Sequence, residues 1–166
     1  MIETLTVITL CVLFLVFFRP GKTPPLDNPL VIERPGKYKM TLAPKLNLAQ
    51  PFIEAISGQM DKLSLSAQHG NTVQCFAVND KQVAANKNNV YLLAIVLREG
   101  MLYFLAEPPK SDDTGNYLET IKTSAKDLLA DIPENDEGDK MLGENIVNAV
   151  QQVSRERGIA VDLLSD

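Results

Sequence analysis

The side chains of this sequence that are best placed to bind a metal ion lie at residues 134–139, in the stretch ENDEGD. A calcium loop of the twelve-residue type needs oxygen ligands at fixed positions and a glycine at the sixth. With Gly138 at the sixth position, Pro133 falls at the first and offers no side-chain ligand. Three other positions do match: Asn135, Glu137 and Glu144. We expect no metal here, because negative charge before a helix is favourable in itself.

Histidine-based and nucleophilic catalysis have little support. His69 is the only histidine, and it lies in a QHGN stretch that is typical of a turn. No cysteine or carboxylate is spaced to pair with it as a zinc ligand or a nucleophile. We therefore expect no catalytic residue, no metal ligand and no cofactor. An enzyme that uses carboxylates such as Asp112, Asp113 or Asp136 stays open as a weaker alternative.

Glycine spacing and charge argue against phosphate and nucleic-acid chemistry. The nine glycines are scattered singly, so there is no glycine-rich phosphate-binding loop. The net charge of -5 is uneven, since residues 107–166 carry fourteen acidic groups against six basic ones. Affinity for nucleic acid comes mainly from neutralising phosphates, so an acidic C-terminal part excludes nucleic acid as the expected partner.

One long polar segment stands between two apolar ones, from Asn79 to Asn89. It contains Lys81, Lys87 and several asparagines. Such a segment is either a binding loop or a solvated connection between two strands. The sequence alone favours the solvated connection.

The N-terminal segment predicts a membrane anchor. Residues 4–18 contain no charged side chain, and Glu3 is the only one in residues 1–18. As a helix of about 1.5 Å per residue, this segment spans roughly 27 Å, close to the roughly 30 Å hydrocarbon core of a bilayer. A cleaved signal peptide would need a basic start and a small-residue cleavage site, and the apolar run ends instead in FFRP. We expect residues 1–18 to form a single transmembrane helix.

The flanking charges predict the direction of that helix. Arg19 and Lys22 follow it, and no lysine or arginine precedes it. Positively charged flanks stay on the cytoplasmic side. We therefore expect a single-pass protein of the cell membrane whose C-terminal domain lies in the cytoplasm. The basic flank either attracts anionic headgroups or serves only as a topological signal.

Residues 19–36 read as a proline-rich basic linker next to the membrane. Five prolines between positions 20 and 35 each fix φ and remove a backbone donor, so no helix can cross this stretch. At about 3.1 Å per residue it would act as an extended spacer. The apolar run Leu30, Val31, Ile32 leaves a second possibility, that this part docks on the domain as an edge strand.

Residues 37–166 predict one α+β domain. Alternating hydrophobicity predicts a strand at residues 37–42, and apolar runs predict further strands at 72–78, 90–97 and 101–106. The last two are joined by Arg98, Glu99 and Gly100 and are typical of a hairpin. Residues 159–164 are expected to add an edge strand.

Three helices complete the predicted domain. The first covers residues 48–63 with Asn47 or Gln50 as its cap, and the second runs from Asp113 or Thr114 to about residue 131. The third runs from Asp139 to a basic last turn before Gly158. The order of elements favours a mainly antiparallel sheet with the helices packed on one face.

An anchor, a proline spacer and a domain without reactive residues favour a function other than catalysis. We expect a membrane-tethered interaction module, for example an accessory or assembly subunit of a membrane complex, with the acidic helices facing a protein partner. The alternative is a membrane-anchored sensor or small-ligand-binding domain. It would require an apolar pocket with convergent polar groups between the sheet and the helices.

Overall fold

The computed structural model describes residues 29–34, 38–65, 70–111, 116–129 and 137–164. Within these residues the chain forms six strands, three α-helices and one 3₁₀ segment. In chain order they are β1 (Leu30–Arg34), β2 (Tyr38–Leu42), η1 (Pro44–Ala49), α2 (Gln50–Lys62), β3 (Thr72–Asn79), β4 (Val90–Arg98), β5 (Met101–Glu107), α3 (Tyr117–Leu129), α4 (Glu137–Arg157) and β6 (Ala160–Leu163). The predicted α+β class is confirmed.

All six strands belong to one sheet, in the order β1-β2-β5-β4-β3-β6. Four neighbouring pairs are antiparallel, and only β2 and β5 are parallel. The β4–β5 hairpin turns at Glu99 and Gly100, both with positive φ, of 50° and 82°. Two consecutive residues of this kind make the tight turn that matches the twist of a hairpin. The prediction of a mainly antiparallel sheet is therefore confirmed, and β6 is the predicted C-terminal edge strand.

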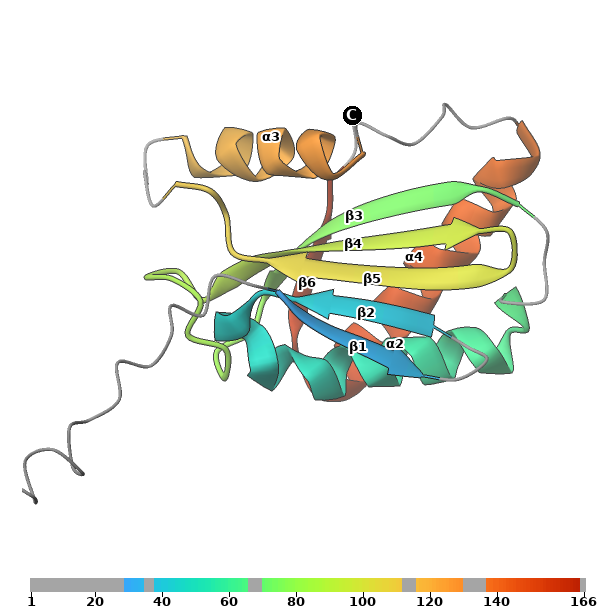
Figure 1. Ribbon diagram of the computed structural model, residues 1–166, viewed down its shortest axis with the longest axis horizontal. Helices are drawn as coiled ribbons and strands as arrows, with labels where there is room; N and C mark the ends of the chain where they lie inside the picture. The colour runs from blue at the N-terminus through green and yellow to red at the C-terminus, as the bar shows by residue number, and fades with distance from the viewer. Residues whose placement is uncertain (1–28, 35–37, 66–69, 112–115, 130–136, 165–166) are drawn as a thin grey trace, which may run out of the picture.

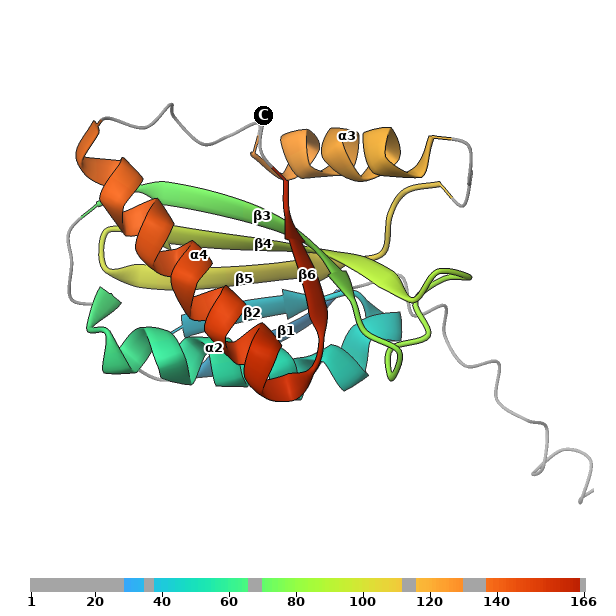
Figure 2. The ribbon, with the colours of Figure 1, turned by 180° about the vertical axis from the view of Figure 1, so that it is seen from behind.

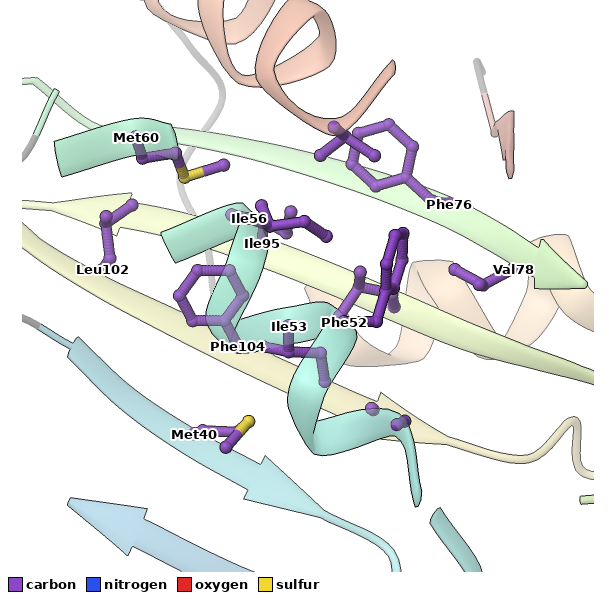
Figure 3. Close-up of a cluster of buried hydrophobic side chains, with 14 of the residues drawn as sticks. Met40, Phe52, Ile53, Ile56, Met60, Phe76, Val78, Ile95, Leu102 and Phe104 are labelled. Atoms are coloured by element: carbon purple, nitrogen blue, oxygen red, sulfur yellow. The ribbon is translucent and has the colours of Figure 1, made fainter. Parts of the chain in front are cut away.

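The helices α2 and α4 pack together on one face of the sheet (Figure 2). Alternate side chains of the strands meet them in the main apolar core (Figure 3). The cluster includes Met40, Phe52, Ile53, Ile56, Met60, Phe76, Val78, Ile95, Leu102 and Phe104. Burial of each such side chain stabilises the fold by about 1.5–3 kcal/mol. This core accounts for the helical spacing of the apolar residues in α2 and for the alternation in β2.

Helix α3 lies on the opposite face, so the expectation that all helices pack on one face is wrong for α3 (Figure 1). Its buried residues Ile121 and Ala125 meet Cys75, Ala77 and other side chains of β3 and β4. The physical reason is visible in β4, whose residues from Val90 to Leu97 are all buried. A strand that is apolar on both faces needs cover on both.

The first helix differs from its prediction at its start. The chain forms η1 before α2, and Ala49 at the N-cap of α2 makes no side-chain cap. Neither Asn47 nor Gln50 is the cap, and Pro51 in the first turn has no N–H that would need one. Helix α4 begins at Glu137, before Asp139, while the expected caps of α3, Asp113 and Thr114, lie outside the described residues.

Part of the predicted linker docks on the domain as an edge strand, the second of the two possibilities for this segment. Residues Leu30–Arg34 form β1, an edge strand that pairs along its length with β2. Arg34 binds Glu54 of α2 through Nη2 and Oε1, 2.7 Å apart. No helix among the described residues is long and apolar enough to cross a bilayer, and the predicted transmembrane helix at residues 1–18 lies outside them.

Candidate functional site

The structure describes only part of the acidic segment that was tested as a calcium loop. From Glu137 onward the backbone is already the helix α4, which includes Gly138 and Glu144. A twelve-residue calcium loop needs a sharp turn at its glycine, so this register does not fit a helix. Within the described residues, no three histidine, cysteine, aspartate or glutamate side chains lie close enough to hold a metal ion. His69, Asp112, Asp113 and Asp136 lie outside those residues.

A groove of about 430 Å³ lies between the start of β3, the first turns of α4 and the end of β6. Polar side chains from two elements line most of it: Thr72, Gln74, Asp139, Lys140, Glu144 and Asn148, with Val147 and Leu163 as apolar members. This volume lies in the range of small-molecule sites.

Two glycines bring the elements together at this groove. A Cβ at Gly143 of α4 would lie 2.5 Å from the side-chain amide nitrogen of Gln74 in β3. A Cβ at Gly70 would lie 2.3 Å from Cδ1 of Leu142. A side chain at either position would have to displace Gln74 or Leu142, so glycine leaves the room that these two side chains occupy. The sequence gives no local signal for either glycine, because each stands alone in its segment.

Asp139 holds the same junction in place. Its Oδ1 accepts a hydrogen bond of 3.1 Å from the backbone N–H of Asn71. Asp139 lies in the first turn of α4, where a carboxylate also interacts favourably with the helix dipole. The groove therefore combines apolar surface with the carboxylates of Asp139 and Glu144 and the ammonium group of Lys140, which are able to orient a small ligand.

A second candidate site is the part of the sheet that α3 leaves uncovered. Helix α3 packs on β3 and β4, with Leu105 near the end of β5 at the border of the same apolar cluster, and in Figure 1 it lies away from β2 and β1. We call the side chains of β1, β2 and β5 on this side the open face. They are Val31, Glu33, Lys39, Thr41, Met101 and Tyr103. Leu105 lies on the same side of the sheet but packs against the apolar cluster beneath α3.

Strand register places these side chains in rows. Val31 pairs with Thr41, and Thr41 pairs with Leu105. In the next row Glu33, Lys39 and Tyr103 stand side by side. Val31 is 49% exposed and Met101 is 38% exposed, high values for apolar side chains in a sheet. Apolar and polar groups therefore alternate on a surface that no described helix covers.

The charges on the open face are paired. Nζ of Lys39 lies 2.9 Å from Oε1 of Glu33, and both side chains are exposed. This hydrogen bond and the charge of Lys39 hold the pKa of the Glu33 carboxyl below its usual range. A hollow of about 180 Å³ opens beside the pair, at the rim of the sheet where side chains of both faces meet. It is lined by Glu33, Arg34, Tyr38, Lys39, Met101 and Tyr103.

The sequence signal for the open face is weak. Strand β5 has apolar residues on both sides, so its sequence alone does not show that part of one side lacks a covering helix. The partial burial of Tyr103 in the structure distinguishes that part.

Comparison of the chain with known proteins gives no relative, since no family model, no curated protein and no solved structure matches it.

Proposed function

We propose that this protein is a membrane-tethered interaction module without catalytic activity, and that its domain binds a protein partner through the open face. Residues 1–18 anchor it in the membrane, and the domain lies on the cytoplasmic side. It acts as an accessory or assembly subunit of a membrane complex.

The observation that carries this proposal is the uncovered half of the sheet. Exposed apolar side chains that occur singly on a protein surface need no explanation. On the open face, however, the exposed Met101 neighbours the partly buried Tyr103 on β5, and the exposed Val31 lies beside Thr41 on β2. The charged pair Glu33 and Lys39 lies in the row between Val31 and Met101. Tyrosine and methionine are enriched in protein interfaces, which combine an apolar centre with polar surroundings. The open face is therefore a better partner surface than the acidic helices.

The test is co-purification of the full-length, tagged protein after extraction in mild detergent. A partner that remains bound to the unaltered protein should be lost from the double variant Val31→Ser, Met101→Ser. The matched control is Leu118→Ser, Met141→Ser, which removes two exposed apolar side chains from α3 and α4. Partner binding to this control should be unchanged.

Two results would count against the proposal. One is the absence of any stoichiometric partner after mild extraction and cross-linking. The other is equal partner binding by both double variants, which would exclude the open face as the interface. Circular dichroism of each variant establishes that the fold is intact before the comparison is made.

The alternative function, binding of a small ligand, is supported by the groove beside Gly143. Native mass spectrometry of the protein purified from cells would reveal a retained small molecule. Gly143→Leu places a side chain against Gln74 and fills the groove, so it should abolish retention. Gly58→Leu is the matched control, because a Cβ at this helical glycine meets nothing within 4 Å. If neither the unaltered protein nor the Gly58→Leu control retains a small molecule, this alternative is excluded.

A further inference from the structure

At one end of the sheet, neighbouring described segments present exposed lysines and leucines. Three segments meet there: the start of β1, the segment η1 and the loop Asp80–Asn89 between β3 and β4. The register places Leu30, at the start of β1, opposite Leu42, which pairs in turn with Ala106 near the end of β5. Both ribbon views show η1 and the loop beside each other at this end (Figures 1 and 2). We call it the basic end.

The loop at the basic end has a defined conformation. Asp80, which is 6% exposed, accepts a hydrogen bond of 2.9 Å from the backbone N–H of Gln82. Asn86 donates to the carbonyl oxygen of Val90 over 2.6 Å and accepts from the N–H of Asn88 over 2.9 Å. Val83 is fully buried in the main core. These contacts fix the backbone that carries Lys81 and Lys87.

The exposed charges of η1 and of the loop Asp80–Asn89 are all positive. Lys45 in η1 and Lys81 and Lys87 in the loop are all exposed, and none forms an ion pair with a described residue. The acidic residue of η1 and the loop is Asp80, whose carboxylate is buried and used within the loop. Leu48 is 59% exposed and Leu30 is 46% exposed. Lysines beside exposed leucines are the combination that suits the boundary between headgroups and acyl chains.

The chain reaches this end from the predicted anchor. The described part of the protein begins at Pro29, immediately before β1, so residues 1–18 are joined to the domain at the basic end. A tether at this position brings the basic end closer to the bilayer than the β4–β5 hairpin, which lies at the far end of the strands.

We propose that the basic end is a second membrane contact, at which Lys45, Lys81 and Lys87 bind anionic lipid headgroups. This inference rests on the proposed function, because it requires the N-terminal anchor. Docking at this end directs the strands away from the bilayer. The open face then stands roughly upright beside the membrane, accessible from the side to a membrane-bound partner.

The test uses the full-length protein reconstituted in lipid nanodiscs and one fluorophore near the basic end. The fluorophore is attached at Ala84→Cys, an exposed position of the loop, in a Cys11→Ala background that keeps the buried Cys75. A nitroxide on the lipid headgroup quenches fluorophores that lie at the surface. Leu63→Cys, an exposed position after the last residue of α2, provides the probe away from the basic end.

Quenching at Ala84→Cys is expected in discs that contain phosphatidylglycerol, and less of it in phosphatidylcholine alone. Each lysine close to an anionic surface contributes enough to change the ratio of docked to undocked protein about fivefold. The triple variant Lys45→Gln, Lys81→Gln, Lys87→Gln should therefore lose most of the quenching, as should high salt. The control is the triple variant Lys62→Gln, Lys126→Gln, Lys140→Gln, which removes the same number of positive charges from other parts of the domain. Its quenching at Ala84→Cys should be unchanged.

The possible failures are distinguishable. Protein that stays in the disc but shows no lipid-dependent quenching at Ala84→Cys overturns this inference and leaves the anchor and the proposed function in place. Equal loss of quenching in both triple variants also overturns it, because net charge alone would then be responsible. Protein that is not retained in the disc at all overturns the anchored function and this inference together.

Discussion

Arg34 at the end of β1 and Glu54 in α2 are joined by a hydrogen-bonded ion pair of 2.7 Å. The two residues are twenty positions apart in the chain, and the pair connects the edge strand of the sheet to the helix beneath it. Glu54 also accepts a hydrogen bond of 3.0 Å from Gln50, one turn earlier in α2. Together, the bond from Gln50 and the pair with Arg34 hold the pKa of the Glu54 carboxyl below its usual value.

Replacing Arg34 with glutamine should loosen β1 without unfolding the domain. Both side chains are partly exposed, and ion pairs of this kind contribute about 0–1 kcal/mol to stability. We expect the free energy of unfolding in urea to fall by no more than about 1 kcal/mol. Amide hydrogen exchange should increase in β1 and stay unchanged in β4. Unchanged exchange in β1 would show that pairing with β2 alone holds the strand.

Tyr91→Phe should be neutral or stabilising. Tyr91 is fully buried in the main core, and its hydroxyl has no hydrogen-bond partner among the described residues. Burial, with a smaller contribution from Asp80, raises the pKa of this phenol far above its usual value. Removing an unpaired buried hydroxyl while keeping the ring should raise the free energy of unfolding, by about 1–2 kcal/mol.

Tyr91→Ala is the contrasting variant, because it removes the ring as well and should cost about 3–5 kcal/mol. Urea denaturation measures both changes. A clear loss of stability in Tyr91→Phe would contradict the absence of a partner for the hydroxyl.

Glu107 at the end of β5 should make stability depend on pH. Burial raises the pKa of its carboxyl above the ordinary value of 4.5, Lys110 opposes the rise, and Asp127 adds to it. The folded state therefore binds more protons than the unfolded state, and this contribution to stability falls as the pH rises from about 4.5 through the folded-state pKa.

Glu107→Gln has no carboxyl to titrate, so it should not show the fall in stability at rising pH that Glu107 causes. Its free energy of unfolding should exceed that of the unaltered protein at neutral pH, and the difference should shrink below pH 4.5. Urea denaturation of both proteins over a pH series tests this. A difference that stays constant with pH would mean that the carboxyl titrates alike in the folded and unfolded states.

Asn86→Ala should release the loop of the basic end. The side chain makes two strong hydrogen bonds within the loop, to the carbonyl of Val90 and from the N–H of Asn88. We expect a cost of about 1–3 kcal/mol and faster amide exchange in the loop. Asn79→Ala, at an exposed position in the adjacent strand, is the control and should leave loop exchange unchanged. Equal exchange in the two variants would show that Val83 and Asp80 suffice to fix the loop.

A short segment of sequence was enough to predict an element when the segment itself contains the residues that determine the element. Strand β2 alternates apolar and polar residues, the β4–β5 hairpin carries Glu99 and Gly100 at its turn, and α4 ends before Gly158. Each of these elements was predicted to within a few residues. The start of α2 was not, because a 3₁₀ turn with Pro44 at its start and a helix with Pro51 in its first turn have similar local preferences.

Neither candidate site could be predicted in the same way. The groove depends on the close approach of Gly143 to Gln74, which are far apart in the chain. The open face depends on where α3 lies, and the sequence of α3 shows only that it has an apolar side. The polar loop, expected to be a solvated connection, owes its conformation to Val83, which is buried in a core built from distant segments.

The sequence by itself determined the order and type of the elements, the α+β class and the expectation of an anchor, because hydrophobic periodicity and proline and glycine positions act over a few residues. The tertiary structure decided the strand order, the parallel pairing of β2 with β5 and the opposite placement of α3. The physical reason is that β3 and β4 are apolar on both sides, so both faces require cover, and only packing selects which helix covers which face. Because α3 packs on β3 and β4, the same face of the sheet stays uncovered over β1, β2 and part of β5.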